Sequence, residues 1–102
     1  NQMMLDDNDG SILIQDQNDN KIEMSSSGIT IKSASNLTIE AAQAVTIKGG
    51  TDVKLEATSK MSLKGLQFEA TADTTAKVAG NASAEISASG TTTVKGAMVM
   101  IN

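Results

Sequence analysis

The sequence of 102 residues lacks cysteine, histidine, proline, tryptophan and tyrosine, and Phe68 is its only aromatic residue. Without cysteine there is no disulfide framework, and the absence of both cysteine and histidine removes the two commonest zinc ligands. A core without aromatic anchors is unusual for a compact globular domain. The absence of proline also argues against a loop-rich linker. These gaps disfavour a conventional globular domain, a disulfide scaffold and a zinc protein.

Acidic residues outnumber basic ones by 12 to 8, and the excess lies near the N-terminus. The first 23 residues carry a net charge of −5, whereas the rest of the chain carries +1. Binding to a nucleic acid backbone requires clustered lysine or arginine, so no nucleic acid partner is expected. The chain begins with Asn1 and shows no signal peptide. We therefore expect a fragment excised from a longer protein.

An internal repeat of eight residues, the octad, organises the middle of the chain. Each octad contains two apolar residues that flank a polar one: Ile29 and Ile31, Leu37 and Ile39, Val45 and Ile47, Val53 and Leu55, Met61 and Leu63. Alternation with a period of two predicts short strands that are buried on one face. A helix is the rival interpretation, and it is disfavoured because the pairs are rich in β-branched residues and their spacing does not match a helical face.

Small or turn-forming residues separate the apolar pairs, as at residues 33–36 and 49–52. Such residues let the chain change direction once in every octad. A chain that turns in the same sense at each corner stacks its short strands into a solenoid. The sequence therefore predicts an all-β fold of the parallel β-helix type.

Changes in spacing and side-chain size divide the chain into four predicted parts. Residues 1–28 form an acidic entry segment with irregular first rungs, and residues 29–65 form the regular octad β-helix. Residues 66–96 form a narrower β-helix, because one inward position of each pair shrinks to Ala or Thr. Residues 97–102 form an apolar blunt tip.

Charged residues follow the apolar pairs at one octad position with alternating sign: Lys32, Glu40, Lys48, Glu56 and Lys64. Stacked strands lie about 4.8 Å apart, so each charge can meet an opposite one on the next rung. In intertwined chains Lys32 faces Glu40 of a neighbour, whereas a single chain with three octads per coil stacks Lys32 on Glu56. Both arrangements remain open, as does a simple solvated surface of alternating charge.

Motifs for metal binding and catalysis are incomplete. Asp16, Asn18 and Asn20 match the first ligands of a calcium loop, but Lys21 replaces the required glycine and Ser27 the bidentate glutamate. We interpret this segment, and the acidic cluster ahead of it, as turns. The serines have no histidine or adjacent base to activate them. We therefore expect no enzymatic activity, no catalytic or metal-binding residue and no cofactor.

Five motifs carry a family resemblance over essentially the whole chain. They are the entry 4–12 (MLDDNDGSI), the segments 20–24 (NKIEM) and 28–31 (GITI), the octads, and the ending 94–102 (VKGAMVMIN). In these motifs the chain resembles the C-terminal needle of contractile-injection spikes, which include the VgrG proteins of type VI secretion and the spikes of contractile phage tails and extracellular injection particles.

The resemblance implies an intertwined parallel homotrimer, a triple-stranded β-helix in the form of a triangular prism. Three chains sharing one core bury more apolar surface per residue than a single chain does. The implied trimer core consists of Ile29, Ile31, Leu37, Ile39, Val45, Ile47, Val53, Leu55, Met61, Leu63, Phe68, Val78, Ile86 and Val94.

The resemblance also implies partners and a cellular route. Upstream domains, absent from this chain, would dock on baseplate and tube proteins. A separate PAAR-type cap would cover the tip at Ala97, Met98, Val99, Met100, Ile101 and Asn102. Related short phage spikes end in a His-ligated iron tip, and this chain departs from that pattern because it has no histidine. The particle would assemble in the cytoplasm of the producer and be delivered to the target cell envelope, where the needle contacts the membrane transiently.

The function implied by the resemblance is that of a structural needle, which transmits the thrust of a contracting sheath and pierces an envelope. A trimeric adhesin or fibre stalk is the alternative. An ice-binding β-solenoid is less favoured, because the column Thr30, Thr38 and Thr46 is interrupted by Lys54.

Overall fold

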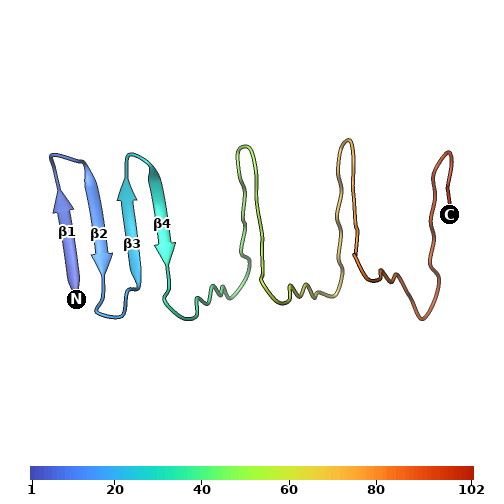
Figure 1. The fold of residues 1–102 in the computed structure, drawn as a ribbon, viewed down its shortest axis with the longest axis horizontal. Coiled ribbons are helices and arrows are strands. Elements are labelled where there is room, and N and C mark those ends of the chain that lie inside the picture. The colour runs from blue at the N-terminus through green and yellow to red at the C-terminus, as the bar shows by residue number, and fades with distance from the viewer. The chain divides into compact units, whose positions relative to one another are not determined.

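The computed structural model describes all 102 residues and contains strands but no helix. The strands are β1 (Gln2–Asp6), β2 (Ser11–Gln15), β3 (Lys21–Ser25) and β4 (Gly28–Lys32). They form one antiparallel sheet in the order β1-β2-β3-β4 (Figure 1). The all-β class predicted from the sequence is confirmed. No helix of a length and hydrophobicity suited to crossing a membrane is present.

Two compact units make up the chain, Asn1–Leu55 and Glu56–Asn102. The first unit contains the whole sheet. Strands β3 and β4 alternate apolar and polar residues, which suits a pleated surface with one apolar side, whereas β1 and β2 each carry three apolar residues in a row.

Short polar turns explain why residues 2–32 pair as consecutive hairpins. After β1, the Asp6 Oδ1 atom accepts hydrogen bonds from the backbone N–H groups of Asn8 (3.0 Å) and Asp9 (3.2 Å). Gly10 then adopts a left-handed φ of 64°, which glycine reaches without strain. After β3, the Ser25 Oγ atom accepts the N–H of Ser27 at 3.2 Å. Side-chain acceptors of this kind favour tight turns, so the entry segment forms a regular antiparallel sheet.

The strand register gathers most of the apolar side chains on one face of the sheet, called here the apolar face, while Met4 and Leu13 oppose each other on the other face. One row across the four strands is Met3, Ile14, Ile22 and Ile31. The second row is Leu5, Ile12, Met24 and Ile29. Directly opposed residues of an antiparallel pair lie on the same side, so all eight share this face.

Beyond β4 the chain runs as straight segments separated by two-residue bends. In the first unit the bends lie at 34–35, 42–43 and 50–51, and in the second at 58–59, 66–67, 73–74, 81–82, 89–90 and 97–98. Successive bends begin eight residues apart, except for one step of seven between 66 and 73. The predicted corner in every octad is confirmed. The straight segments do not pair into a sheet within the chain, so the predicted β-helical stacking is not formed by one chain alone.

A small residue precedes every bend. These residues are Ser33, Ala41, Gly49, Ala57, Gly65, Ala72, Gly80, Ala88 and Gly96. At Gly80 a Cβ atom would collide with the backbone carbonyl of Ser83, and at Gly49 with that of Asp52. The bends at these two positions are therefore accessible only to glycine.

We expect Gly80→Ala to destabilise the protein by about 1–3 kcal/mol, because backbone atoms must move to admit the new methyl group. Gly90→Ala is the matched control, since a Cβ atom there meets nothing within 4 Å. The control should shift stability by less than about 1 kcal/mol, and in the stabilising direction. Thermal unfolding of the two variants checks this. Equal midpoints would contradict the assigned bend geometry.

Candidate assembly surface

The apolar face of the sheet lies open to solvent. No hydrophobic residue anywhere in the chain is buried, and among the residues of this face Met3, Leu5, Ile29 and Ile31 are largely exposed. Scattered exposed apolar side chains are ordinary, but a contiguous apolar face of eight residues is not. This face is therefore the candidate assembly surface of the chain.

A groove on this face continues the apolar surface beyond the sheet. Its apolar lining comes from Met3, Ile14, Ile22, Ile31 and Leu37, so it joins one complete row of the sheet to the first octad after β4. Polar residues at its edge include Asn1, Gln2, Gln15, Asp16, Lys21 and Lys32. An apolar floor with a polar edge is the usual anatomy of a protein interface.

Exposed apolar pairs also occur in the octads of each unit. Ile39 and Ile47 in the first unit are 69% and 68% exposed, and Leu63 in the second is 66% exposed. All 14 residues assigned to the trimer core are exposed in the single chain: Ile29, Ile31, Leu37, Ile39, Val45, Ile47, Val53, Leu55, Met61, Leu63, Phe68, Val78, Ile86 and Val94. Their burial in a trimer stays a prediction.

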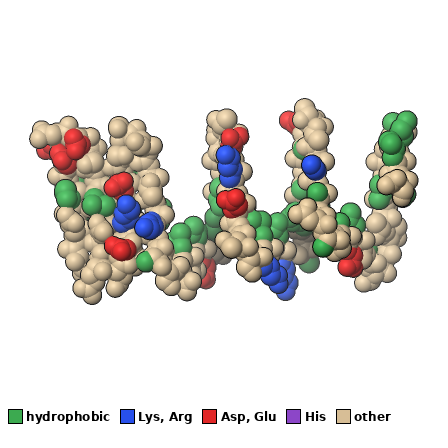
Figure 2. Space-filling model, in the orientation of Figure 1, with side chains coloured by type: hydrophobic (Ala, Val, Ile, Leu, Met, Phe, Trp, Pro, Cys, Tyr) green, Lys and Arg blue, Asp and Glu red, His purple; other side chains and the backbone are tan.

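The opposite face of the sheet is mostly polar. Figure 2 shows lysine and acidic side chains lying together over the strands on the side turned to the viewer. Lys21 of β3 stands directly opposite Lys32 of β4. The carboxylate of β3, Glu23, stands opposite Thr30 and is one diagonal step from Lys32. Like charges that directly oppose each other on paired strands are unfavourable. The residue of β3 directly opposite Lys32 is therefore not a partner of complementary charge.

A hydrogen-bonded group that we call the clasp fixes the direction in which the chain leaves the sheet. It consists of Asp16, Asn20 and Ala34. The Asp16 Oδ1 atom accepts the N–H of Asn20 at 3.0 Å, and Asn20 Nδ2 donates to Asp16 Oδ2 at 3.0 Å. Asn20 Oδ1 accepts the N–H of Ala34 at 2.8 Å, across 14 residues of sequence. The clasp therefore ties the β2–β3 turn to the first bend after β4.

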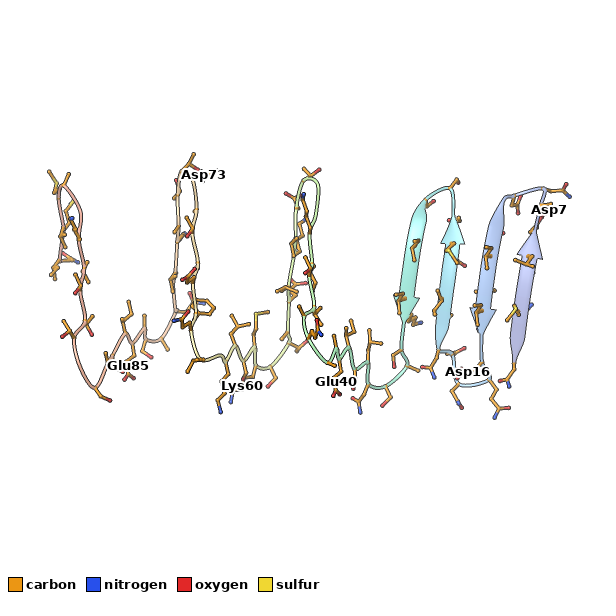
Figure 3. The ribbon with its side chains drawn as sticks, turned by 180° about the vertical axis from the view of Figure 1, so that it is seen from behind. Asp7, Asp16, Glu40, Lys60, Asp73 and Glu85 are labelled. Atoms are coloured by element: carbon orange, nitrogen blue, oxygen red, sulfur yellow. The ribbon has the colours of Figure 1, made fainter.

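Asp16, Asn18 and Asn20, which match the first ligands of a calcium loop, instead form hydrogen bonds within the β2–β3 turn. Besides its bonds to Asn20, Asp16 Oδ1 accepts the N–H of Asn18 at 2.9 Å, and Asp19 takes a left-handed φ of 69°. The interpretation of both acidic clusters as turns is confirmed, and Figure 3 shows Asp7 and Asp16 at the ends of hairpins. No group of three acidic side chains converges in a way that could hold a metal ion.

The tip begins at the last bend. Met98 lies in that bend, and Met100 and Ile101 are 85% and 92% exposed. The six residues proposed to bind a cap, Ala97, Met98, Val99, Met100, Ile101 and Asn102, are all accessible to a partner.

The hydrogen bond between Asn20 and Ala34 is the contact at this surface that the sequence did not predict. The position of Asn20 four residues after Asp16 suggested only a turn, because nothing in the local pattern indicates a bond to Ala34. No model of a known protein family matches the chain, and no curated protein matches it either.

The clasp predicts a loss of stability in acid. Hydrogen bonds from the Asn20 side chain, and then from the backbone of Asn20 and Asn18, lower the pKa of the Asp16 carboxyl. A lowered pKa in the folded state contributes stability at neutral pH that is lost as the pH falls below the ordinary aspartate value of about 3.9.

Asp16→Asn is the variant that isolates this effect, because the amide keeps one acceptor oxygen and cannot titrate. The difference in thermal midpoint between the wild-type protein and the variant should shrink between pH 7 and pH 2.5. A difference that stays constant over this range would mean that Asp16 is not the titrating group.

Proposed function

We propose that this chain forms the shaft of a homotrimeric spike, and that it serves as a mechanical needle. The observation that carries the proposal is the regular recurrence of an exposed apolar pair in the straight segments between bends, with Thr92 in place of one apolar residue in the last of them. A single chain leaves these pairs in water, and it also leaves the backbone groups of the straight segments without strand partners.

Three chains that share one axis can bury the apolar pairs and also give the backbone groups strand partners. Each straight segment then hydrogen bonds to segments of its neighbours, and the apolar pairs meet at the centre. A bend in every octad provides the corners of a triangular prism, and the resulting fold is a triple-stranded β-helix. The apolar face of β1–β4 joins the same core at the N-terminal end of the shaft.

The proposed role as a needle follows from the stiffness of such an intertwined assembly. Intertwined chains cannot unwind singly, and continuous backbone pairing resists compression. The resemblance to contractile-injection spikes supplies the context: upstream domains on a baseplate and tube, assembly in the cytoplasm of a producer, a PAAR-type cap on the tip, and transient contact with a target membrane. No catalysis or cofactor is part of the proposal.

The first test is the state of association. Light scattering in native buffer should give three times the chain mass of 10.5 kDa. Ile39→Asp would place three carboxylates near the axis, where an unpaired charge costs about 3–5 kcal/mol, so the trimer should be lost. Thr38→Asp is the matched control, because Thr38 lies on the outward side of the same segment and should tolerate the charge. A monomeric wild-type chain, or equal tolerance of both substitutions, would refute the proposal.

The second test concerns the tip. Removal of residues 97–102 should abolish binding of a PAAR-type cap, measured by calorimetry, and leave the trimer intact. Met98→Ser together with Met100→Ser tests the outward methionines while keeping Val99 and Ile101. A trimer that never binds a cap would instead point to a fibre or adhesin stalk.

A further inference from the structure

The bends divide the chain into segments whose net charge alternates without exception from β4 to the last bend. The positive segments are 28–32, 44–49, 60–65, 75–80 and 91–96, and the negative ones, which lie between them, are 36–41, 52–57, 68–72 and 83–88. Only Asp73 places a charge within a bend. The alternation therefore belongs to the straight segments, which are the parts that can stack.

The position of the charge changes along the chain, whereas the alternation of sign does not. Up to Lys64 the alternating charge lies two residues before each bend. From Glu69 it lies four residues before the bend, as in Lys77 and Glu85, and it returns to the earlier position at Lys95. Both positions have the same parity, so they lie on the same outward side of an extended segment.

We propose that segments of one chain stack on segments of a neighbouring copy with an offset of one segment, and that the alternating charge fixes this register. This inference rests on the trimer proposed above and adds the pairing within it. An offset of one places a positive segment beside a negative one at every level. An offset of zero or two places like charges together at every level, because the signs repeat every second segment.

Lys32 shows how the first contact is made. Within the chain it opposes Lys21, so β3 does not supply its complementary charge directly. The other edge of β4 is free, because β4 is the last strand of the sheet. A neighbouring segment 36–41 placed on that edge brings Glu40 beside Lys32, at the spacing of about 4.8 Å between adjacent strands.

Individual exposed ion pairs contribute little, and one such contact would not determine a register. The effect here arises because all contacts change together. A slip by one segment turns every attraction along the shaft into a repulsion, while the apolar pairs would still meet in the slipped arrangement. Charge is therefore the property that distinguishes registers which hydrophobic burial alone leaves equivalent.

Cysteine cross-linking reads the register directly, because the chain has no cysteine of its own. Thr30 and Thr38 occupy the same position in successive segments, both are exposed, and neither is charged. Chains with Thr30→Cys and chains with Thr38→Cys should be refolded together and oxidised. We expect disulfides between the two variants in up to about half of the chains, because each mixed trimer holds one Thr30→Cys site beside a Thr38→Cys site, and we expect neither variant to form a dimer alone.

Other cross-links would overturn the inference. Dimers of Thr38→Cys alone would indicate an offset of zero, and cross-links between Thr30→Cys and Thr46→Cys chains would indicate an offset of two. A disulfide within one chain carrying both Thr38→Cys and Ser62→Cys would indicate a single-chain coil with three segments per turn. A trimeric mass with any of these patterns refutes the register alone, whereas a monomeric mass refutes the proposed function.

Charge reversal supplies an independent test with a matched control. Glu85→Lys makes three successive segments positive, whereas Asp73→Lys makes the same change of charge within a bend; both residues are labelled in Figure 3. We expect Glu85→Lys to lower the thermal midpoint of the trimer by several degrees at low salt and Asp73→Lys to leave it unchanged. The difference should vanish in 1 M salt, where charges are screened beyond about 3 Å. Equal midpoints at low salt would overturn the inference.

Discussion

Each straight segment is too short to bury its apolar side chains or pair its backbone by itself, and the rest of the molecule depends on this constraint. A segment of five or six residues between two bends offers one apolar pair and two unpaired backbone edges. Neither can be satisfied inside a chain that has no buried residue. In the proposed assembly, other segments that lie alongside supply both the burial and the backbone pairing, and the regular bends present every segment in the same way.

The entry sheet meets this constraint only in part. Its four strands pair their backbones through short turns, so the edges within the sheet are satisfied. Its eight apolar residues nevertheless remain on one uncovered face, and the clasp directs the chain from that sheet into the first bend. The sheet thus begins an apolar surface that Leu37 of the next octad continues, although its strands pair antiparallel within one chain.

The repeat and the corners could be predicted from the sequence because they depend on local properties. Alternating Ile, Leu and Val indicate strands, and Ser, Ala or Gly before each bend indicates a change of direction. The antiparallel pairing of β1–β4 and the bond from Asn20 to Ala34 could not be predicted. The same alternating pattern suits hairpins and stacked rungs, and the choice depends on Asp6, Asp16 and Ser25 accepting backbone hydrogen bonds.

The spacing of seven residues between the bends at 66–67 and 73–74 shows which features of a segment are kept when its length changes. Phe68 follows its bend one residue earlier than Leu37 follows its own, so this segment is one residue shorter. The apolar pair and the sign of the charge both survive this change, while the exact position of the charge does not. A contact between single side chains would be lost when the charge moves by two residues. A contact between whole segments tolerates the shift, since diagonal neighbours on one face remain within reach of Lys and Glu. In the proposed assembly, the apolar pairs bring segments together, and the net charge of each segment selects which ones pair.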